Sequence, residues 1–123
     1  MKRVLIDSSG WVELFCGGSK AKKFEKFILE PYELIVPSLV IFDVYRKIKK
    51  TLGESKAIFA VTQMQRGTEV GLDAHLALYA ADISLSHPLP MADAIVYATA
   101  LFHKALLITA DNDFRGLAEV EIF

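Results

Sequence analysis

Four aspartates stand at the boundaries of the elements that this sequence predicts: Asp7, Asp43, Asp93 and Asp111. Two of them follow apolar runs, and the other two lie near the expected starts of helices. If they meet in one cleft, the partly desolvated carboxylates repel and raise one another's pKa, so the cluster needs a counter-charge. A hard divalent cation such as Mg²⁺ or Mn²⁺ prefers oxygen ligands of this kind. The chemistry that such a site supports is metal-assisted hydrolysis of a phosphodiester.

The elements that must position these acids alternate along the chain. Val4, Leu5 and Ile6 form an unbroken apolar run before Asp7, which is typical of a strand buried on both faces of a parallel sheet. The predicted strands cover residues 2–6, 33–36, 68–72, 105–109 and 118–123, and the predicted helices cover 10–15, 20–30, 38–51, 55–65, 74–86 and 91–103. This order predicts an α/β fold in which a parallel β-sheet of four to five strands carries helices on both faces.

One edge of that sheet should collect the acids. Right-handed crossovers bring the carboxyl end of every strand and the start of every following helix to the same edge. We expect Ser8 or Ser9 to cap the first helix and Ser38 the third. Asp73, a predicted helix cap after the third strand, meets the same criterion and is the main alternative acid. Asp43 stands among apolar neighbours, where an unpaired carboxylate would be costly to bury.

Length and composition narrow the classes of protein. The chain has 123 residues and is 53% hydrophobic, which is enough for the core of one domain spanning residues 1–123. Its apolar runs are far shorter than the roughly 20 residues of a membrane helix, so we expect no membrane association and a cytoplasmic location. Cys16 is the single cysteine, which excludes an internal disulfide. With a net charge of −1, any binding of nucleic acid would depend on local groups of cations.

Four short motifs contain the four aspartates. They are Val4–Ser9 (VLIDSS), Val36–Val40 (VPSLV) followed by the acid at position 43, Met91–Ala100 (MADAIVYATA) and Leu107–Phe114 (LITADNDF). In this order and spacing the sequence resembles a PIN domain, and among PIN domains it is most similar to the VapC-type toxin ribonucleases of toxin–antitoxin systems. The resemblance extends from residue 4 to about residue 120.

The resemblance implies a PIN-like three-layer fold and the activity of a divalent-metal-dependent endoribonuclease. In this family the first and fourth strands are neighbours, so Asp7 and Asp111 should lie side by side. Carried over by position, Asp7, Asp93 and Asp111 hold Mg²⁺ or Mn²⁺. Asp43 completes the acidic quartet at a position where the family usually has Glu, and its shorter side chain would reach the ion directly or through a water. The polar residues that match those around the acids are Ser8, Thr109 and Asp113.

The expected partners also follow from the resemblance. They are an RNA substrate, a VapB-type antitoxin protein and a second copy of the chain in a homodimer. Arg46, Lys47 and Lys50 lie three, four and seven residues after Asp43, so a phosphate backbone could follow this helical face to the acids. The same cations would also complement the negative end of their helix, and the sequence leaves both interpretations open.

Three other readings of the same residues stay open. A PIN-like module that has lost activity through Asp43 would bind RNA or protein without cleaving it. A phosphoacceptor receiver would use Asp73 after the third strand, although Asp7 lacks the neighbouring acid that such a domain needs. A phosphatase would use Asp7 as a covalent nucleophile, but Ser9 stands where a second acid is usual.

Overall fold

A five-stranded parallel sheet forms the middle layer of the protein. The structure is a computed structural model that describes residues 1–123. The strands lie in the order β3-β2-β1-β4-β5, and every neighbouring pair is parallel. Their bounds are β1 Arg3–Ile6, β2 Glu33–Pro37, β3 Thr68–Val70, β4 Leu106–Thr109 and β5 Val120–Ile122. The predicted parallel α/β sheet is confirmed, and β1 and β4 are neighbours as the family resemblance implied.

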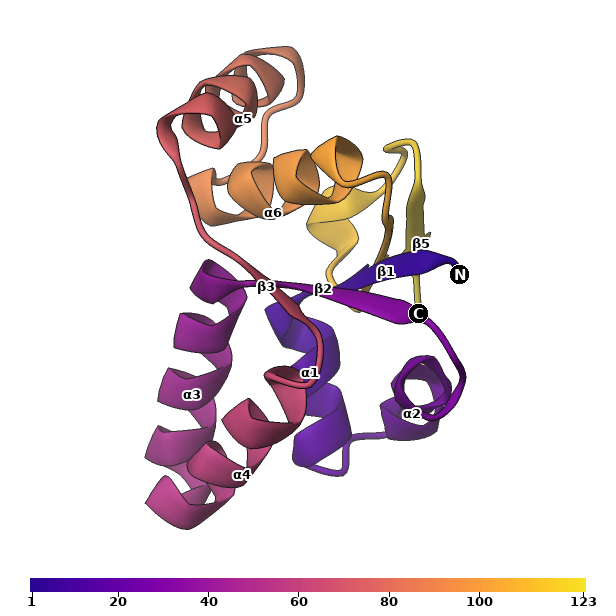
Figure 1. Ribbon diagram of the computed structural model, residues 1–123, viewed down its shortest axis with the longest axis vertical. Helices are drawn as coiled ribbons and strands as arrows, with labels where there is room; N and C mark the ends of the chain where they lie inside the picture. The colour runs from indigo at the N-terminus through magenta and orange to yellow at the C-terminus, as the bar shows by residue number, and fades with distance from the viewer.

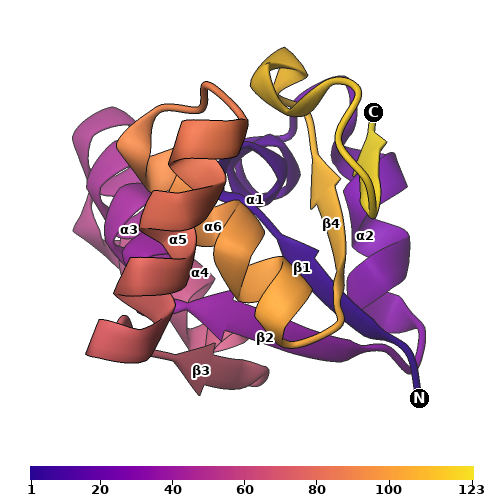
Figure 2. The same ribbon diagram turned by 90° about the horizontal axis from the view of Figure 1, so that it is seen from above.

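Helices cover both faces of the sheet. They are α1 Ser8–Phe15, α2 Ala21–Leu29, α3 Ser38–Leu52, α4 Glu54–Met64, α5 Ala74–Ser86 and α6 Met91–Phe102, and a short 3₁₀ turn, η1, spans Asn112–Phe114. Figure 1 shows α5 and α6 on one side of the strands and α1 to α4 on the other. In Figure 2, which looks down on the sheet from above, α5 and α6 lie in front of the strands. The arrangement is the expected three-layer fold.

The central strands are apolar because both of their faces are covered. Leu5, Ile6, Leu107 and Ile108 are at most 1% exposed to solvent. Burial of such side chains contributes about 1.5–3 kcal/mol each to the free energy of unfolding. The two strands that end at the acids are therefore held firmly in the middle of the sheet.

The register of β1 against β4 brings the ends of these strands together. Leu5 pairs with Leu107 and Ile6 with Ile108. The ladder continues one step further, because the Asp7 backbone N–H donates to the Ile108 carbonyl at 3.2 Å. The chain therefore leaves β1 at Asp7 directly beside the end of β4.

Two predicted helix caps need correction. Helix α1 begins at Ser8 because Asp7, not a serine, caps it, and its side chain accepts a hydrogen bond from the Gly10 N–H. Helix α3 begins at Ser38 itself, so this serine is the first helical residue and makes no capping bond. The cap at Asp73 is confirmed, since its Oδ1 accepts from the Leu76 N–H at 2.8 Å.

The longest helix of the fold, α3, has 15 residues. None of the helices combines the length and the apolar character that crossing a bilayer requires.

Candidate metal centre

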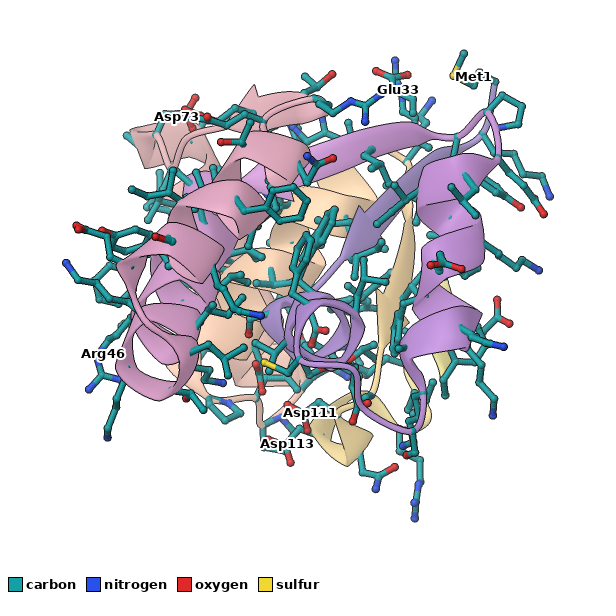
Figure 3. The ribbon with its side chains drawn as sticks, turned by 90° about the horizontal axis from the view of Figure 1, so that it is seen from below. Met1, Glu33, Arg46, Asp73, Asp111 and Asp113 are labelled. Atoms are coloured by element: carbon teal, nitrogen blue, oxygen red, sulfur yellow. The ribbon has the colours of Figure 1, made fainter.

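Three carboxylates meet beyond the end of β4. Asp93, Asp111 and Asp113 each offer one oxygen, and these oxygens lie within 4.8 Å of one another. Asp93 stands in the first turn of α6, Asp111 follows β4, and Asp113 belongs to η1. Figure 3 shows Asp111 and Asp113 together in that turn. The donor set consists of oxygens only, which suits a hard divalent cation.

The pKa of Asp93 reflects the negative charge of the neighbouring carboxylates. Its pKa is raised from 3.8 to about 7, first by desolvation and then by the charges of Asp111, Asp113 and Asp7. A carboxyl–carboxyl hydrogen bond with Asp113 adds to the rise. Near neutral pH the cluster therefore shares a proton unless a cation replaces it.

Asp7 is buried where the end of β1 meets the start of α1 and the end of β4. It is 5% exposed, its Oδ1 accepts from the Ser9 hydroxyl at 2.6 Å and from the Gly10 N–H at 3.1 Å, and its Oδ2 accepts from the Thr109 hydroxyl at 2.7 Å. Burial raises the pKa of Asp7, and these hydrogen bonds oppose the rise. A carboxylate has about four lone-pair sites, so roughly one remains for a ligand. Such an enclosed carboxylate is poorly placed as a covalent nucleophile, which argues against the phosphatase reading.

The Thr109 hydroxyl links Asp7 to Asp111. It donates to Asp7 and accepts from the Asp111 backbone N–H at 2.9 Å. The Asp111 carboxylate in turn accepts from the Asp113 N–H at 2.9 Å. Because Thr109 is fully buried, its side chain is shielded from water. These hydrogen bonds therefore connect Asp7, at the end of β1, to Asp111 and Asp113. They do not include Asp93.

Ser9, expected only as a possible helix cap, supports the acids through two hydrogen bonds. Its hydroxyl donates to Asp7 and accepts from the Ala110 N–H at 3.0 Å, so it ties α1 to the residue before Asp111. Ser8, which was expected in a supporting role, makes no side-chain hydrogen bond. With Asp7 as the helix cap, both serines fall in the first turn of α1, and only the packing of this turn against the end of β4 selects Ser9.

The approach of α1 to β1 depends on a glycine. A Cβ at Gly10 would lie 2.6 Å from Cγ2 of Ile6 and 2.7 Å from Cε1 of Phe24. Both distances are well below van der Waals contact. Only glycine allows α1 to pack this closely on the strand that ends at Asp7.

Asp43 lies outside the group of three carboxylates. It is half-buried on α3, and because its neighbour Phe42 is 62% exposed, apolar side chains enclose it only in part. Helix α3 nevertheless packs against α6, the helix that carries Asp93. Asp113, expected only beside the site, takes its place among the clustered oxygens.

Asp73 is far from the centre. Figure 3 shows it at the opposite end of the molecule from Asp111 and Asp113. It follows β3, an edge strand that is separated from β1 by β2. The strand order also differs from the 2-1-3-4-5 order of flavodoxin-like signalling domains, so the receiver reading is wrong.

The predicted RNA-binding cations lie on the outside of α3. Arg46, Lys47 and Lys50 are all exposed, and none forms a salt bridge. Figure 3 shows Arg46 pointing away from the body of the molecule. Their cationic groups are therefore free for a ligand.

The chain is similar to known proteins over nearly its whole length. A family model of the PIN domain matches residues 4–120. A toxin–antitoxin complex from Klebsiella pneumoniae is 24% identical, with a TM-score of 0.80 over 96% of this chain and 95% of that chain. VapC20 of Mycobacterium tuberculosis, a toxin that cleaves the sarcin–ricin loop, is 15% identical with a TM-score of 0.77 over 94% and 95%.

A DNA-bound VapBC from Salmonella typhimurium is 14% identical, with a TM-score of 0.78 over 100% of this chain and 98% of that chain. None of the curated proteins matches the chain. At these identities the solved structures show a shared fold over its full length.

Proposed function

The chain belongs to the PIN domain family, and from this premise we propose that it is a divalent-metal-dependent endoribonuclease, the toxin of a type II toxin–antitoxin pair. The observation that carries the proposal is the group of three carboxylates at the end of β4. The likeness to toxins and toxin–antitoxin complexes of the same fold supports it. In this proposal residues 1–123 act as a single PIN-like domain.

The donor set fits one Mg²⁺ or Mn²⁺. Oxygens on a single octahedral Mg²⁺ lie about 3 Å apart when adjacent and about 4 Å apart when opposite. The three carboxylate oxygens lie within 4.8 Å of one another, so small side-chain rotations would close them on an ion. Asp93, Asp111 and Asp113 would hold the ion, with the remaining lone pair of Asp7 beside them. Asp43, shorter than the usual Glu, would act through a water.

When bound, such an ion supplies polarisation of a phosphoryl oxygen and activation of water for hydrolysis of the RNA phosphodiester. The protein's own contribution is position. Thr109 and Ser9 fix the carboxylate of Asp7 and the backbone that leads to Asp111. Arg46, Lys47 and Lys50 would hold the phosphate backbone of the RNA. We propose no nucleophilic side chain.

The remaining partners are part of the same proposal. A VapB-type antitoxin would bind and inhibit the nuclease, and the nuclease itself would form a homodimer. The nuclease and the antitoxin would act in the cytoplasm. Neighbours described as toxin–antitoxin and VapBC complexes support the first of these.

A cleavage assay tests the proposal. Purified protein is incubated with a structured RNA in EDTA, in Mg²⁺ and in Mn²⁺, and the products are separated by gel electrophoresis. We expect metal-dependent cleavage that Asp111→Asn and Asp7→Asn abolish while circular dichroism shows both variants folded. Asp73→Asn is the matched control, because it keeps a helix-capping side chain far from the centre. Full activity in Asp111→Asn would refute the assignment.

The position of Asp43 favours a second candidate function, an inactive PIN-like module that binds RNA or protein. It would bind RNA with the same affinity in EDTA and in Mn²⁺, and would yield no cleavage products. Asp43→Glu, which restores the usual longer acid, would then create activity.

A further inference from the structure

Helix α3 carries an aromatic and basic hollow on its solvent side. Its core face is formed by Val40, Val44 and Ile48, which are at most 1% exposed. The opposite side has a hollow of about 420 Å³, which we call the α3 hollow; it is lined by Phe42, Tyr45, Arg46, Lys49 and Lys50. These residues recur at helical spacing and form one continuous stripe.

Phe42 is the unusual member of this stripe. Its side chain is 62% exposed, and it takes part in none of the aromatic pairs of the fold. Tyr45, by contrast, is already engaged, because Lys49 Nζ lies 5.4 Å from its ring centroid and 3.4 Å from its hydroxyl. Phe42 therefore offers a free aromatic face to a ligand.

Two of the three cations that line the α3 hollow are free as well. Helix α3 holds four cations and one acid, Asp43. Lys49 forms a salt bridge with Glu54 at 3.6 Å, but Arg46 and Lys50 form none. Two unpaired cations thus lie four and eight residues after an exposed phenyl ring.

We propose that the α3 hollow binds a single-stranded segment of the RNA substrate, with a base stacked on Phe42 and the adjoining phosphates on Arg46 and Lys50. An exposed aromatic ring beside free cations is an arrangement by which proteins hold unpaired nucleic acid. A duplex cannot use Phe42, because its bases are stacked on one another and hidden. The inference rests on the proposed function and names Phe42 as the residue that contacts an unpaired base.

The position of the hollow connects it to the acids. Phe42 precedes Asp43 in the first half of α3, and this helix packs against α6, which carries Asp93. A strand that stacks on Phe42 would therefore pass the α3–α6 contact on its way to the carboxylates.

A second copy of the chain is a poorer occupant. In a two-fold dimer across this face, each α3 would meet the other, and the excess of three positive charges on each helix would repel. A polyanion neutralises the same charges instead.

Binding of fluorescently labelled RNA tests the inference, with anisotropy as the readout. The full chain carries Asp111→Asn, and the buffer contains EDTA, so that no cleavage occurs and the acidic cluster is less charged. We expect Phe42→Ala to weaken binding of a single-stranded pyrimidine RNA about tenfold and to leave its salt dependence unchanged. We expect Phe42→Trp to restore binding and Phe42→Leu not to. Phe59→Ala removes a phenylalanine of matched exposure, 59%, on α4 and should have no effect.

Three results would overturn the inference. The first is that Phe42→Ala binds the single strand as tightly as its parent, or that neither protein binds it. The second is an equal loss for a hairpin duplex. The third is a sedimentation experiment in which Phe42→Ala dissociates a dimer and RNA binding is unaffected, which would assign the hollow to a second copy. Metal-dependent cleavage is measured separately, so its absence refutes the proposed function without deciding the role of Phe42.

Discussion

Asp93→Asn should stabilise the metal-free protein and abolish its response to divalent ions. The native pKa of Asp93 is raised from 3.8 to about 7, so between these pH values the native state binds a proton that the unfolded chain has lost. Stability therefore falls as pH rises through this window and levels off above about pH 7. The full shift would correspond to about 4 kcal/mol, and because Asp93 is only half-buried, solvent screening reduces the expected effect to about 2 kcal/mol.

Urea denaturation at several pH values, in EDTA, measures this difference. At pH 8 the variant should exceed the wild type by about 2 kcal/mol in the free energy of unfolding, and at pH 3 the two should agree. Added Mn²⁺ should stabilise the wild type and leave the variant unchanged, because a ligand of the native state raises stability by mass action. Asp82→Asn, an exposed acid on α5, should change neither result. A variant less stable than the wild type at pH 8 would show that Asp93 is held by an attractive contact, and the reasoning from repulsion would be wrong.

Three further predictions concern the parts that position the centre and its ligand. Gly10→Ala should lower the free energy of unfolding by about 1–3 kcal/mol in urea, because the new Cβ overlaps Ile6 and Phe24; unchanged stability would contradict the close packing. Thr109→Val should cost about 1–3 kcal/mol and weaken Mn²⁺ binding measured by calorimetry, whereas Thr109→Ser should preserve both. Arg46→Ala combined with Lys50→Ala should weaken RNA binding and make it less dependent on salt, and equal binding at all salt concentrations would favour a role at the helix end.

The sequence was sufficient for the framework of the site because strong regularities determine it. The apolar runs before Asp7 and Asp111 marked two central strands, and the direction of parallel strands placed both acids at one edge. The same rule placed Asp93 at this edge, since it lies in the first turn of the helix that precedes β4.

The finer assignments depended on features that a pattern does not contain. Asp113 joins the cluster only because the chain turns through η1 after Asp111. The choice between Ser8 and Ser9 depends on which residue caps α1, and a shift of one position moves a hydroxyl to another side of the helix. The reach of Asp43 depends on the packing of α3 against α6, which spacing along the chain does not reveal.

The hydrogen bonds of Thr109 also bear on the motions of the protein. Its buried hydroxyl joins the Asp7 carboxylate to the Asp111 backbone, and Ser9 joins the same carboxylate to Ala110. Local opening of this region must break these bonds together, so the amides of Gly10, Ala110 and Asp111 should exchange with solvent deuterium as one unit. An ion bound by the acids would slow the exchange of all three amides together. Their exchange rates would then show whether the metal centre is occupied.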